Sequence, residues 1–517
     1  MTGGLVISNK HLRKTAILYM ALPLFVFYCG FLRWYYSLLC CTALLYVVWH
    51  AVSKQSEDAA FGRESIIGGK TVCVVFLFTL LWSYLGGMNG YYYQSSDWNC
   101  RHAVYFDLIQ FDWPVIYTES GGALVYYIGH WLPPALLAKA VLWITGSMRW
   151  ARFMGRLFLW GWSSLGLTII ILLLFCALHA EKGRQRIAVV CLFVFFSGLD
   201  LLGAISNGRI GYVTRADILH LEWWCSGYQF TSVTACLFWV FNQAIIPWMI
   251  TLCFLQEGDP RNYIFYCVAC LLCGPLPCVG LVILMLVKAG MFLARSWREG
   301  ELRQALKKTF SPANMAALLF LFPVTAAYIL ANNAAAGGDS AAAARSGFFS
   351  GDYLNLYLAR FLTMEVGLYM LFVFADHWKD PLFYAIGLTF LVVPYFHVGV
   401  SYDFCMRASI PAIFVLMIYV SRFLLEHFSW PFIKDTTGKR GDRLRRVSAW
   451  GLAVCFAIGM GTPLMELYRG AYHVAKSKTV FLEDRSLMTF NTQEVPYNFG
   501  CDNPEEQFFF RYFAKEE

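Results

Sequence analysis

Long apolar segments separated by short polar connections recur along almost the whole chain. A helix needs about 20 consecutive apolar residues to cross the hydrocarbon core of a bilayer. The candidate spans are 15–31, 33–52, 70–87, 122–146, 157–180, 187–205, 233–255, 262–294, 314–331, 353–376, 381–399, 404–427 and 447–465. The pattern predicts an all-α fold, a polytopic transmembrane helix bundle with about 12–13 spans.

The polar segments divide this predicted bundle into parts. Residues 1–466 form the transmembrane domain, and residues 467–517 form a mixed polar and aromatic tail outside the bilayer. The long segment 88–121 is an external loop, dense in aromatic and acidic residues. The small residues of 332–347 are low in complexity and predict a mobile external loop.

Composition supports the membrane assignment. Of the 517 residues, 58% are apolar and 14% are charged, whereas soluble domains carry about 25% charged residues. The net charge of +8 is concentrated in short connections such as 295–308 and 434–446, as the positive-inside rule expects of cytoplasmic loops. A nucleic-acid partner is excluded, because its binding surface would gather basic residues on a folded soluble face. Membrane lipids are the expected surroundings.

Charge also predicts the orientation of the chain ends. The N-terminus and the loop 53–70 lie inside, so the following span delivers 88–121 to the outer face. The strongly basic 434–446 lies inside, which places the tail outside. Cys100, Cys225 and Cys501 fall in polar segments, and a disulfide among them stays open.

The middle of the chain allows two topologies, because the basic clusters 149–156 and 181–186 compete for the inner side. In the first, 122–146 does not cross, since a proline pair breaks it into a hairpin or interfacial pair. Segment 262–294 then crosses twice and turns at its Gly-Pro-Leu-Pro stretch. In the second, both segments cross once. We favour the first, which places 206–232 outside.

The first stretch with candidate chemistry lies in the external loop. Asp97 and Arg101 stand four residues apart, so a helix places them on one face. The guanidinium can grip phosphate oxygens in a fork, and the carboxylate can accept a proton from a hydroxyl nucleophile. Asp107 offers a second catalytic carboxylate, and Trp98 and His102 flank the pair as binding residues. The alternative is a loop helix held by a surface ion pair.

The second stretch combines acids, tryptophans, a histidine and an amide: Asp200, His220, Glu222, Trp223, Trp224 and Gln229. Tryptophan faces stack on the C–H faces of sugars, while carboxylates hold hydroxyl groups. Ionisable groups at membrane depth are costly and often functional. The alternative is an ordinary interfacial aromatic belt.

The third stretch begins a predicted span. Asp403 and Arg407 again stand four residues apart. An arginine one helical turn inside a span can meet a lipid-linked phosphate at headgroup level, where the amide dipoles of the helix start favour an anion. The alternative is an intramolecular ion pair with a snorkelling arginine.

These segments resemble the GT-C class of membrane glycosyltransferases, which place an aspartate in the first large external loop. Asp97 in 88–121 matches that position, and 332–347 resembles the later flexible loop of the class. The chain resembles more closely a group of bacterial multi-spanning proteins that share the segments DWxxR, SGLD, HxEWW and DFxMRxxIP and the ending FFxxYxAK.

The resemblance implies a GT-C-like bundle with external juxtamembrane helices in the bacterial inner (cytoplasmic) membrane, with its site facing the periplasm. It implies a polyprenyl-phosphate-linked sugar as donor, an extracytoplasmic glycan or lipid as acceptor, no certain cofactor, and a divalent metal only as an option. The expected roles are a general base for Asp97, phosphate binding for Arg101 and Arg407, and a sugar pocket for Trp98, Glu222, Trp223 and Trp224.

Other functional classes remain open at this stage. A transporter or flippase of lipid-linked glycans would need polar groups through the bilayer, and Lys139, Arg360 and Glu365 are the candidates. A glycan polymerase or ligase would share the lipid-phosphate chemistry, and a structural membrane subunit would need none. The chain contains no Walker loop, GxSxG elbow or HExxH motif, so ATP-driven transport and common hydrolase chemistry lack support.

Overall fold

The protein is an all-α polytopic bundle in which nine helices of the described part are long and apolar enough to cross a membrane. The computed structural model describes residues 6–55, 65–95, 97–215, 217–225, 227–333, 347–348, 356–397, 403–428, 440–476, 486–489 and 497–516. The nine are α1 (Asn9–Phe31), α2 (Trp34–Ser53), α6 (Met148–Ala177), α10 (Val233–Gln256), α12 (Pro275–Arg298), Leu302–Leu330, Leu356–His377, α21 (Ile410–His427) and Arg443–Lys476.

Three of these nine spans are interrupted. The span Leu302–Leu330 contains α13 (Leu302–Thr309), α14 (Pro312–Ala316), a π-helical turn (Ala317–Leu321) and α15 (Phe322–Leu330). The span Leu356–His377 contains α17 (Leu356–Leu362), a second π-helical turn (Thr363–Gly367) and α18 (Leu368–His377). The span Arg443–Lys476 contains most of α22 (Arg440–Gly459) and all of α23 (Gly461–Lys476).

Shorter helices and short strands complete the described part. The helices are α3 (Gly69–Leu85), α4 (Asp97–Gln110), α5 (Leu132–Thr145), α7 (Gly183–Phe195), α8 (Asp200–Ser206), α9 (Gly211–Thr214), α11 (Tyr263–Cys273), α19 (Pro381–Val392), α20 (Asp403–Ala408) and α24 (Phe508–Tyr512). The strands are β1 (Val6–Ser8), β2 (Ile66–Gly68), β3 (Ile116–Tyr117), β4 (Gly122–Leu124), β5 (Gly347–Phe348), β6 (Phe396–His397) and β7 (Gly500–Cys501). If the bent pair α7 and α8 is one span, the count of candidate spans rises to ten.

One end of the bundle, which we call the basic end, joins the starts of α1 and α3. Strand β1 pairs antiparallel with β2 there. Arg186 Nη1 donates to Thr71 Oγ1 at 3.0 Å, and Arg261 Nη1 donates to the carbonyl of Lys54 at 3.4 Å. Lys308 adds an ion contact with Asp259 at 3.8 Å. The basic residues of several connections therefore gather at one end, as the charge pattern predicted.

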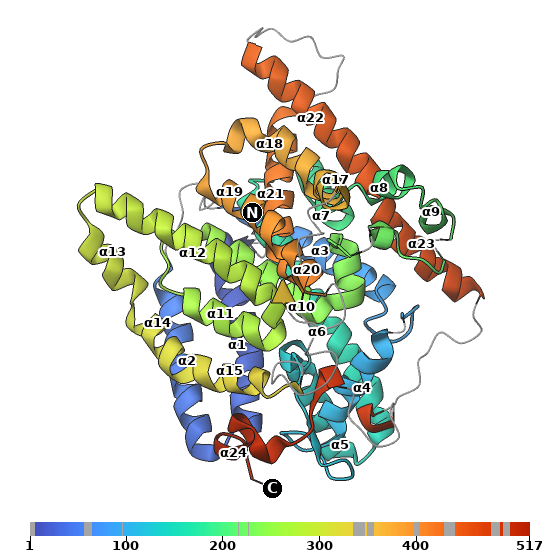
Figure 1. Ribbon diagram of the computed structural model, residues 1–517. Helices are drawn as coiled ribbons and strands as arrows, with labels where there is room; N and C mark the ends of the chain where they lie inside the picture. Colours follow the sequence, from blue (N-terminus) through green and yellow to red (C-terminus); the bar gives the residue numbers. More distant parts are fainter. Residues whose placement is uncertain are drawn as a thin grey trace.

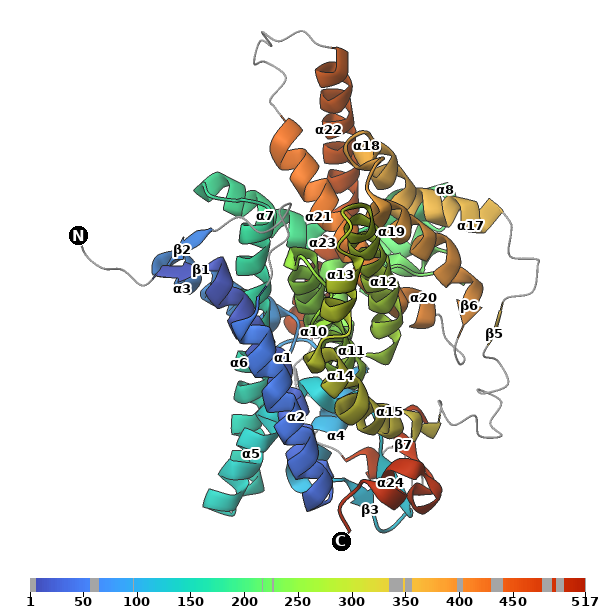
Figure 2. The same cartoon turned by 90° about the vertical axis from the view of Figure 1, so that its left-hand side faces the viewer.

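The opposite end, which we call the tail end, carries the C-terminal residues. The amide of Arg33, between α1 and α2, donates to the carbonyl of Phe513 at 2.9 Å, and the amide of Lys515 donates to the carbonyl of Phe31 at 3.0 Å. Strand β4 pairs with both β3 and β7, so the external loop and the tail share a three-stranded sheet. Figure 2 shows β3, β7 and α24 beside one another at the end of α1 and α2 that is remote from β1.

The two competing basic clusters lie at different ends. Arg152 Nη2 donates to Gln110 Oε1 at 3.4 Å, and the Arg156 guanidinium lies 5.7 Å from the centre of the Phe106 ring. Helix α6 therefore starts at the tail end. Its last carbonyl, that of Ala177, accepts a hydrogen bond from Arg422 Nη2 at 3.3 Å near the basic end. The structure thus agrees with the favoured topology on this point, because 181–186 shares the basic end with the N-terminus.

Segment 122–146 is not one helix, as the favoured topology requires. It consists of β4, a 3-10 turn at Ile128–His130 and the 14-residue helix α5. The expected hairpin is wrong, however, because Pro133 and Pro134 occupy the first turn of α5. Proline is favoured there, since the first helical amides have no intrahelical acceptor. The proline pair starts a helix instead of breaking one.

Segment 262–294 turns back at Gly274, which separates α11 from α12. Figure 1 shows the two helices side by side. The expected turn is confirmed. Helix α11 has 11 residues, which at 1.5 Å per residue span about 16 Å, well short of the roughly 30 Å of a bilayer core. It does not make a full crossing by itself, so the expected pair of crossings is wrong: in this segment, α12 alone is long enough to span a bilayer.

The C-terminal boundary also differs from the sequence-based one. The last helix continues to Lys476, so the tail begins about ten residues later than the predicted 467. The loop predicted as mobile, 332–347, lies almost wholly outside the described residues. Asn332 and Asn333 at its start contact the tail end, since Asn332 Nδ2 donates to the carbonyl of Val125 at 2.6 Å and Asn333 Nδ2 donates to Asp502 Oδ1 at 2.8 Å.

Candidate functional site

Helix α4 holds the first predicted pair at the tail end of the bundle. Arg101 Nη2 donates to Asp97 Oδ2 at 3.2 Å across one helical turn. The helix is anchored by Trp98, whose Nε1 donates to the carbonyl of Phe238 at 3.1 Å and whose ring stacks on Phe241. The Asp97 side chain is 53% exposed, whereas Arg101 is buried. The pair therefore presents its carboxylate outward and its guanidinium inward.

Helix α20 repeats this arrangement about 300 residues later in the chain. Arg407 Nη2 lies 3.0 Å from Asp403 Oδ2, again across one turn, and the Asp403 side chain is 39% exposed. The predicted span 404–427 is in fact two helices, because α20 ends at Ala408 and α21 begins at Ile410. Because of this break, the Asp–Arg pair lies on the short helix α20 and not on the spanning helix α21.

The structure brings the two pairs together. Arg101 lies within electrostatic range of Arg407 and Asp403, and Arg407 lies within range of Asp97. Burial, only partly offset by Asp97, lowers the pKa of Arg101. Burial alone would also lower the pKa of Arg407, but Asp403 and its other neighbours hold it above the usual value. Both guanidinium groups stay charged, since the ordinary pKa of arginine exceeds 12.

Each arginine keeps an unsatisfied donor. Arg101 Nη1 and Arg407 Nε are buried and have no hydrogen-bond partner among the described residues. A buried donor without a partner costs about 1–3 kcal/mol, and more when it is charged. Two such donors on guanidinium groups within electrostatic range of each other suit an anion with several oxygens, which can accept from both.

Two tyrosines that sequence analysis missed border the arginines. Tyr126 and Tyr127 lie in the segment before α5, with their rings stacked at 4.2 Å. Tyr127 hydrogen-bonds Arg407, and Tyr126 lies within electrostatic range of both arginines. No sequence motif marks them, because only the fold of β4 and the following turn carries them to α20.

The second predicted stretch forms a buried cluster of carboxyl groups. Asp200 Oδ2 accepts hydrogen bonds from Ser197 Oγ at 2.9 Å and from Thr462 Oγ1 at 2.6 Å. Glu365, in a π-helical turn, hydrogen-bonds Asp200 and accepts from Trp224 Nε1 at 2.8 Å. Glu365 belongs to a span, and π-helical turns occur often at functional sites.

Glu222 lies beside this cluster on the 3-10 turn Leu221–Trp224. It accepts hydrogen bonds from the amide of Ser232 at 2.9 Å and from Gln229 Nε2 at 3.0 Å. Burial and the nearby Asp200 raise the pKa of Glu222 to about 8. Its carboxyl group is therefore largely protonated at neutral pH, and it can donate a hydrogen bond as well as accept one.

His220 belongs to a separate ionic network with α23. Its Nδ1 lies 2.9 Å from Glu466 Oε1, and Arg469 Nη1 donates to the same oxygen at 2.6 Å. Trp239 Nε1 donates to Glu466 Oε2 at 3.0 Å. A crevice of about 20 Å³ lies between Trp98, Trp239 and Glu466, which is room for about one water molecule. It connects the start of α4 with the His220 network.

Helix α20 links the arginines to the acids. Cys405 hydrogen-bonds the backbone of Gln229 and lies within electrostatic range of Glu365. The three stretches that sequence analysis singled out are therefore neighbours in the fold. Glu466 and Arg469 were not predicted, and Glu365 was named only as a candidate for a carrier.

Exposure separates the predicted residues into two groups. Asp97, Asp403 and Trp223 reach the surface, with Trp223 46% exposed. The others are buried or nearly so: Trp98, Arg101, His102, Asp107, Asp200, His220, Glu222 and Trp224. Gln229 and Arg407 lie partly buried between them. The surface group marks where a substrate can first make contact.

His102 and Asp107 face the interior of the protein. His102 Nε2 lies 2.6 Å from Gln94 Nε2, and burial together with Arg156 and Arg101 lowers its pKa to about 3, so the ring stays neutral. Asp107 Oδ2 accepts from Tyr117 Oη at 2.7 Å. The geometry gives both residues a packing role in the loop.

We expect Asp107 to hold the tail against the external loop. Its Oδ2 also accepts from the amide of Leu487 at 3.0 Å. Asp107→Ala will leave that buried amide and the Tyr117 hydroxyl unsatisfied, at a cost of about 1–3 kcal/mol each. Faster cleavage of the 486–489 region in limited proteolysis measures this effect. Tyr117→Phe removes only one of the bonds and will have a smaller effect, and equal cleavage rates in all three proteins would contradict the assignment.

Glu222 gives a pH prediction. Its folded-state pKa of about 8 lies above the ordinary glutamate value, so the native state keeps a proton that the unfolded chain loses. The contribution of Glu222 to stability is therefore complete below about pH 4.5 and is lost, on the order of a few kcal/mol, as pH rises toward 8. Glu222→Gln will flatten this fall in thermal unfolding between pH 5 and 8.5. The exposed Glu506→Gln is the control and will keep the wild-type slope. Identical slopes in wild type and Glu222→Gln would contradict the prediction.

A metal site at the arginines has little support from the residues around them. Among the described residues, three metal-type ligands lie close together in one group, Asp376, Glu426 and His427. Arg445 Nε already donates to Asp376 at 2.7 Å. The group sits where α21 ends, near the basic end, whereas Asp97 and Asp403 each bind an arginine.

The chain matches no protein-family model, and it matches neither a curated protein nor a solved structure.

Proposed function

We propose that the protein is a membrane glycosyltransferase that takes its sugar from a polyprenyl-phosphate-linked donor. The observation that supports this proposal is the proximity of two Asp–Arg pairs on α4 and α20. In each pair the arginine keeps one buried N–H donor without a partner among the described residues. A phosphate accepts from both arginines in a fork that a single lysine cannot supply. The exposed carboxylates beside them suit a hydroxyl acceptor.

The proposed reaction is a direct displacement. Asp97 takes the proton of the acceptor hydroxyl as its oxygen attacks the anomeric carbon of the donor. The new carbon–oxygen bond forms as the bond from that carbon to the phosphate oxygen breaks, and the electron pair leaves with the polyprenyl phosphate. Arg101 and Arg407 stabilise the charge that develops on the departing phosphate. One attack of this kind inverts the anomeric centre.

Nearby groups are placed to hold the sugar. Trp223 exposes its ring, and His220 lies 4.7 Å from it between ring centres. Aromatic rings pack on the C–H faces of sugars, and Glu222 and Gln229 supply hydrogen-bonding groups a short distance away. Trp98 and Trp224 are buried and support these groups from behind.

The basic end gives the proposed orientation. Because positive residues favour the cytoplasmic side, the tail end with both Asp–Arg pairs faces outward. In a bacterial inner membrane this places the reaction at the periplasmic surface, where lipid-linked sugars meet glycan or lipid acceptors.

A second candidate function, a transporter or flippase of lipid-linked glycans, is favoured by one observation. Asp200 and Glu365 form a carboxyl pair inside the bundle, and Glu365 lies in the span Leu356–His377. Ionisable groups at such depth often serve ion-coupled carriers. A polymerase or ligase would use the same phosphate site with a larger acceptor.

The deciding experiment uses the full chain in nanodiscs with polyprenyl-phosphate sugars and a soluble hydroxyl acceptor. Release of polyprenyl phosphate with matching glycosylation of the acceptor is the expected result. Movement of the labelled donor across a vesicle membrane without any release would instead support the carrier. An intact donor in both assays would remove both proposals.

A further inference from the structure

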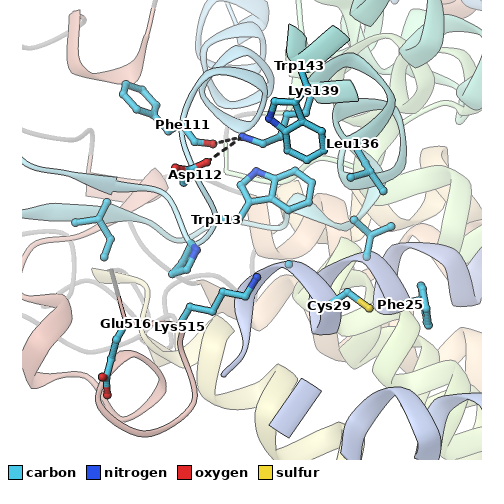
Figure 3. Close-up of a pocket in the computed structure, with 14 residues that line it drawn as sticks. Phe25, Cys29, Phe111, Asp112, Trp113, Leu136, Lys139, Trp143, Lys515 and Glu516 are labelled. Carbon is cyan, nitrogen blue, oxygen red and sulfur yellow. Dashed lines mark hydrogen bonds and ion pairs between the residues drawn. The ribbon is translucent and has the colours of Figure 1, made fainter. Parts of the chain in front are cut away.

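A second cavity lies apart from the arginines, at the other end of α4. It has a volume of about 760 Å³ and is bounded by α1, α5, the residues after α4 and the C-terminus. Figure 3 shows its lining, with Phe25 and Cys29 on α1, Trp113 after α4, and Leu136 and Lys139 on α5. Volumes of 300–1,000 Å³ are typical of sites for small ligands. Helix α4 has 14 residues, so about 20 Å separates this groove from Asp97.

The groove opens beside apolar surface. Phe25 and Leu136 on its walls are each 37% exposed, and Trp143 is 68% exposed. Helix α1 is long and apolar enough to span a bilayer, and the groove lies near its tail-end terminus. Tryptophan is enriched at the boundary between lipid chains and headgroups. The walls therefore fit the chains of a lipid, and the position fits the level of its headgroup.

The rim of the groove carries charges of both signs. Lys515 extends toward the cavity in Figure 3, and its ammonium group has no ion pair among the described residues. Lys139 Nζ donates to the carbonyl of Phe111 at 2.5 Å and lies 3.9 Å from Asp112, whose side chain is fully exposed. Glu516 is already bound to Arg33 at 2.9 Å. Two lysines and one exposed carboxylate, which Lys139 contacts only at 3.9 Å, thus surround the opening.

This charge pattern suits a headgroup with both signs. A phosphate can lie between the two lysines, each of which keeps free N–H donors, while a primary ammonium meets Asp112. A purely anionic headgroup would place its charge beside the exposed Asp112, whose one ion contact, with Lys139, is long at 3.9 Å. A quaternary ammonium has no N–H to donate. The pattern therefore favours a phospholipid with a primary amine over the other common headgroups.

We infer that the groove between α1, α5 and the C-terminus binds an aminophospholipid of the phosphatidylethanolamine type. Lys139 and Lys515 contact its phosphate, Asp112 contacts its ammonium, and Phe25 and Leu136 contact its chains. The site is independent of the proposed sugar transfer, because none of these side chains touches the Asp–Arg pairs.

The test measures lipids that stay bound. The full chain is extracted from vesicles of equal phosphatidylethanolamine, phosphatidylglycerol and phosphatidylcholine, and bound lipid is identified by native mass spectrometry. Wild type is expected to retain phosphatidylethanolamine above its bulk share. Lys515→Ser and the space-filling Cys29→Trp will each reduce this retention about five- to tenfold. Asp112→Asn will lose the preference for the amine headgroup and retain phosphatidylglycerol equally well.

Two controls keep the result decisive. Arg511→Ser removes an exposed cation from the same tail and will retain lipid like wild type. Thermal unfolding of each variant separates a lost site from a lost fold. Retention of the three lipids in bulk proportions, preference for phosphatidylglycerol in wild type, or unchanged retention in folded Lys515→Ser and Cys29→Trp would each overturn the inference.

Discussion

Asp97→Asn will abolish sugar transfer while leaving the protein folded. Asparagine keeps the size of the side chain but cannot take the acceptor proton, and a positioned general base contributes about 10²- to 10⁴-fold to rate. The carboxylate is half exposed and its contact within the described residues is with Arg101, so its loss removes little stability. The expected measurement is a fall in the rate of polyprenyl phosphate release to the background level, with an unchanged unfolding temperature.

Two further variants sharpen this prediction. Glu119→Gln changes another exposed carboxylate of the external loop and will keep full activity. Asp403→Asn removes the other exposed carboxylate of the site, whose role is to hold Arg407, and will slow transfer much less than Asp97→Asn. Near-normal activity in Asp97→Asn would sink the assignment of the base.

The sequence predicted the class of fold because hydrophobic length is a local property. Spans such as α2 and α10 could be placed to within one residue from their apolar segments, whereas α1 begins six residues before its predicted start. The positions of the shorter helices, such as α11, could not be predicted in this way. A run of apolar residues such as 262–273 reads the same whether it crosses a bilayer or packs inside the bundle, since burial against protein and against lipid both select apolar side chains.

The effect of the proline pair was also ambiguous in the sequence. Pro133 and Pro134 break a helix when they lie inside it and begin one when they lie in its first turn, and the sequence alone does not say where the turn falls. Gly274 was informative because Pro275 follows it, and the two together mark the turn between α11 and α12.

The candidate site was predictable in parts. Each Asp–Arg pair is a local signal, since a spacing of four residues makes a contact within one helix. Their meeting depends on the fold, and so does the approach of Tyr126 to both arginines. The burial of Asp107 could not be predicted from the sequence either, because its hydrogen-bond partner Leu487 lies about 380 residues away in the chain.

Substitution of Arg101 or Arg407 is expected to weaken binding of the lipid-linked donor strongly. Arg101→Lys and Arg407→Lys keep the positive charge but lose the planar fork that grips two phosphate oxygens. Each will raise the KM for the lipid-linked donor by about tenfold to a hundredfold, which corresponds to about 1.4–2.8 kcal/mol of binding. Arg511→Lys, on the exposed tail, is the matched control and will leave the KM unchanged.

The double variant distinguishes one shared phosphate from two separate contacts. If both arginines bind the same group, the losses will not add, because side chains that share a partner couple by about 0.5–3 kcal/mol. Independent effects would instead multiply in the KM. Strict multiplication, or a KM that stays unchanged in both single variants, would show that the two arginines do not share a donor phosphate. The proximity of the two Asp–Arg pairs would then have no role in donor binding.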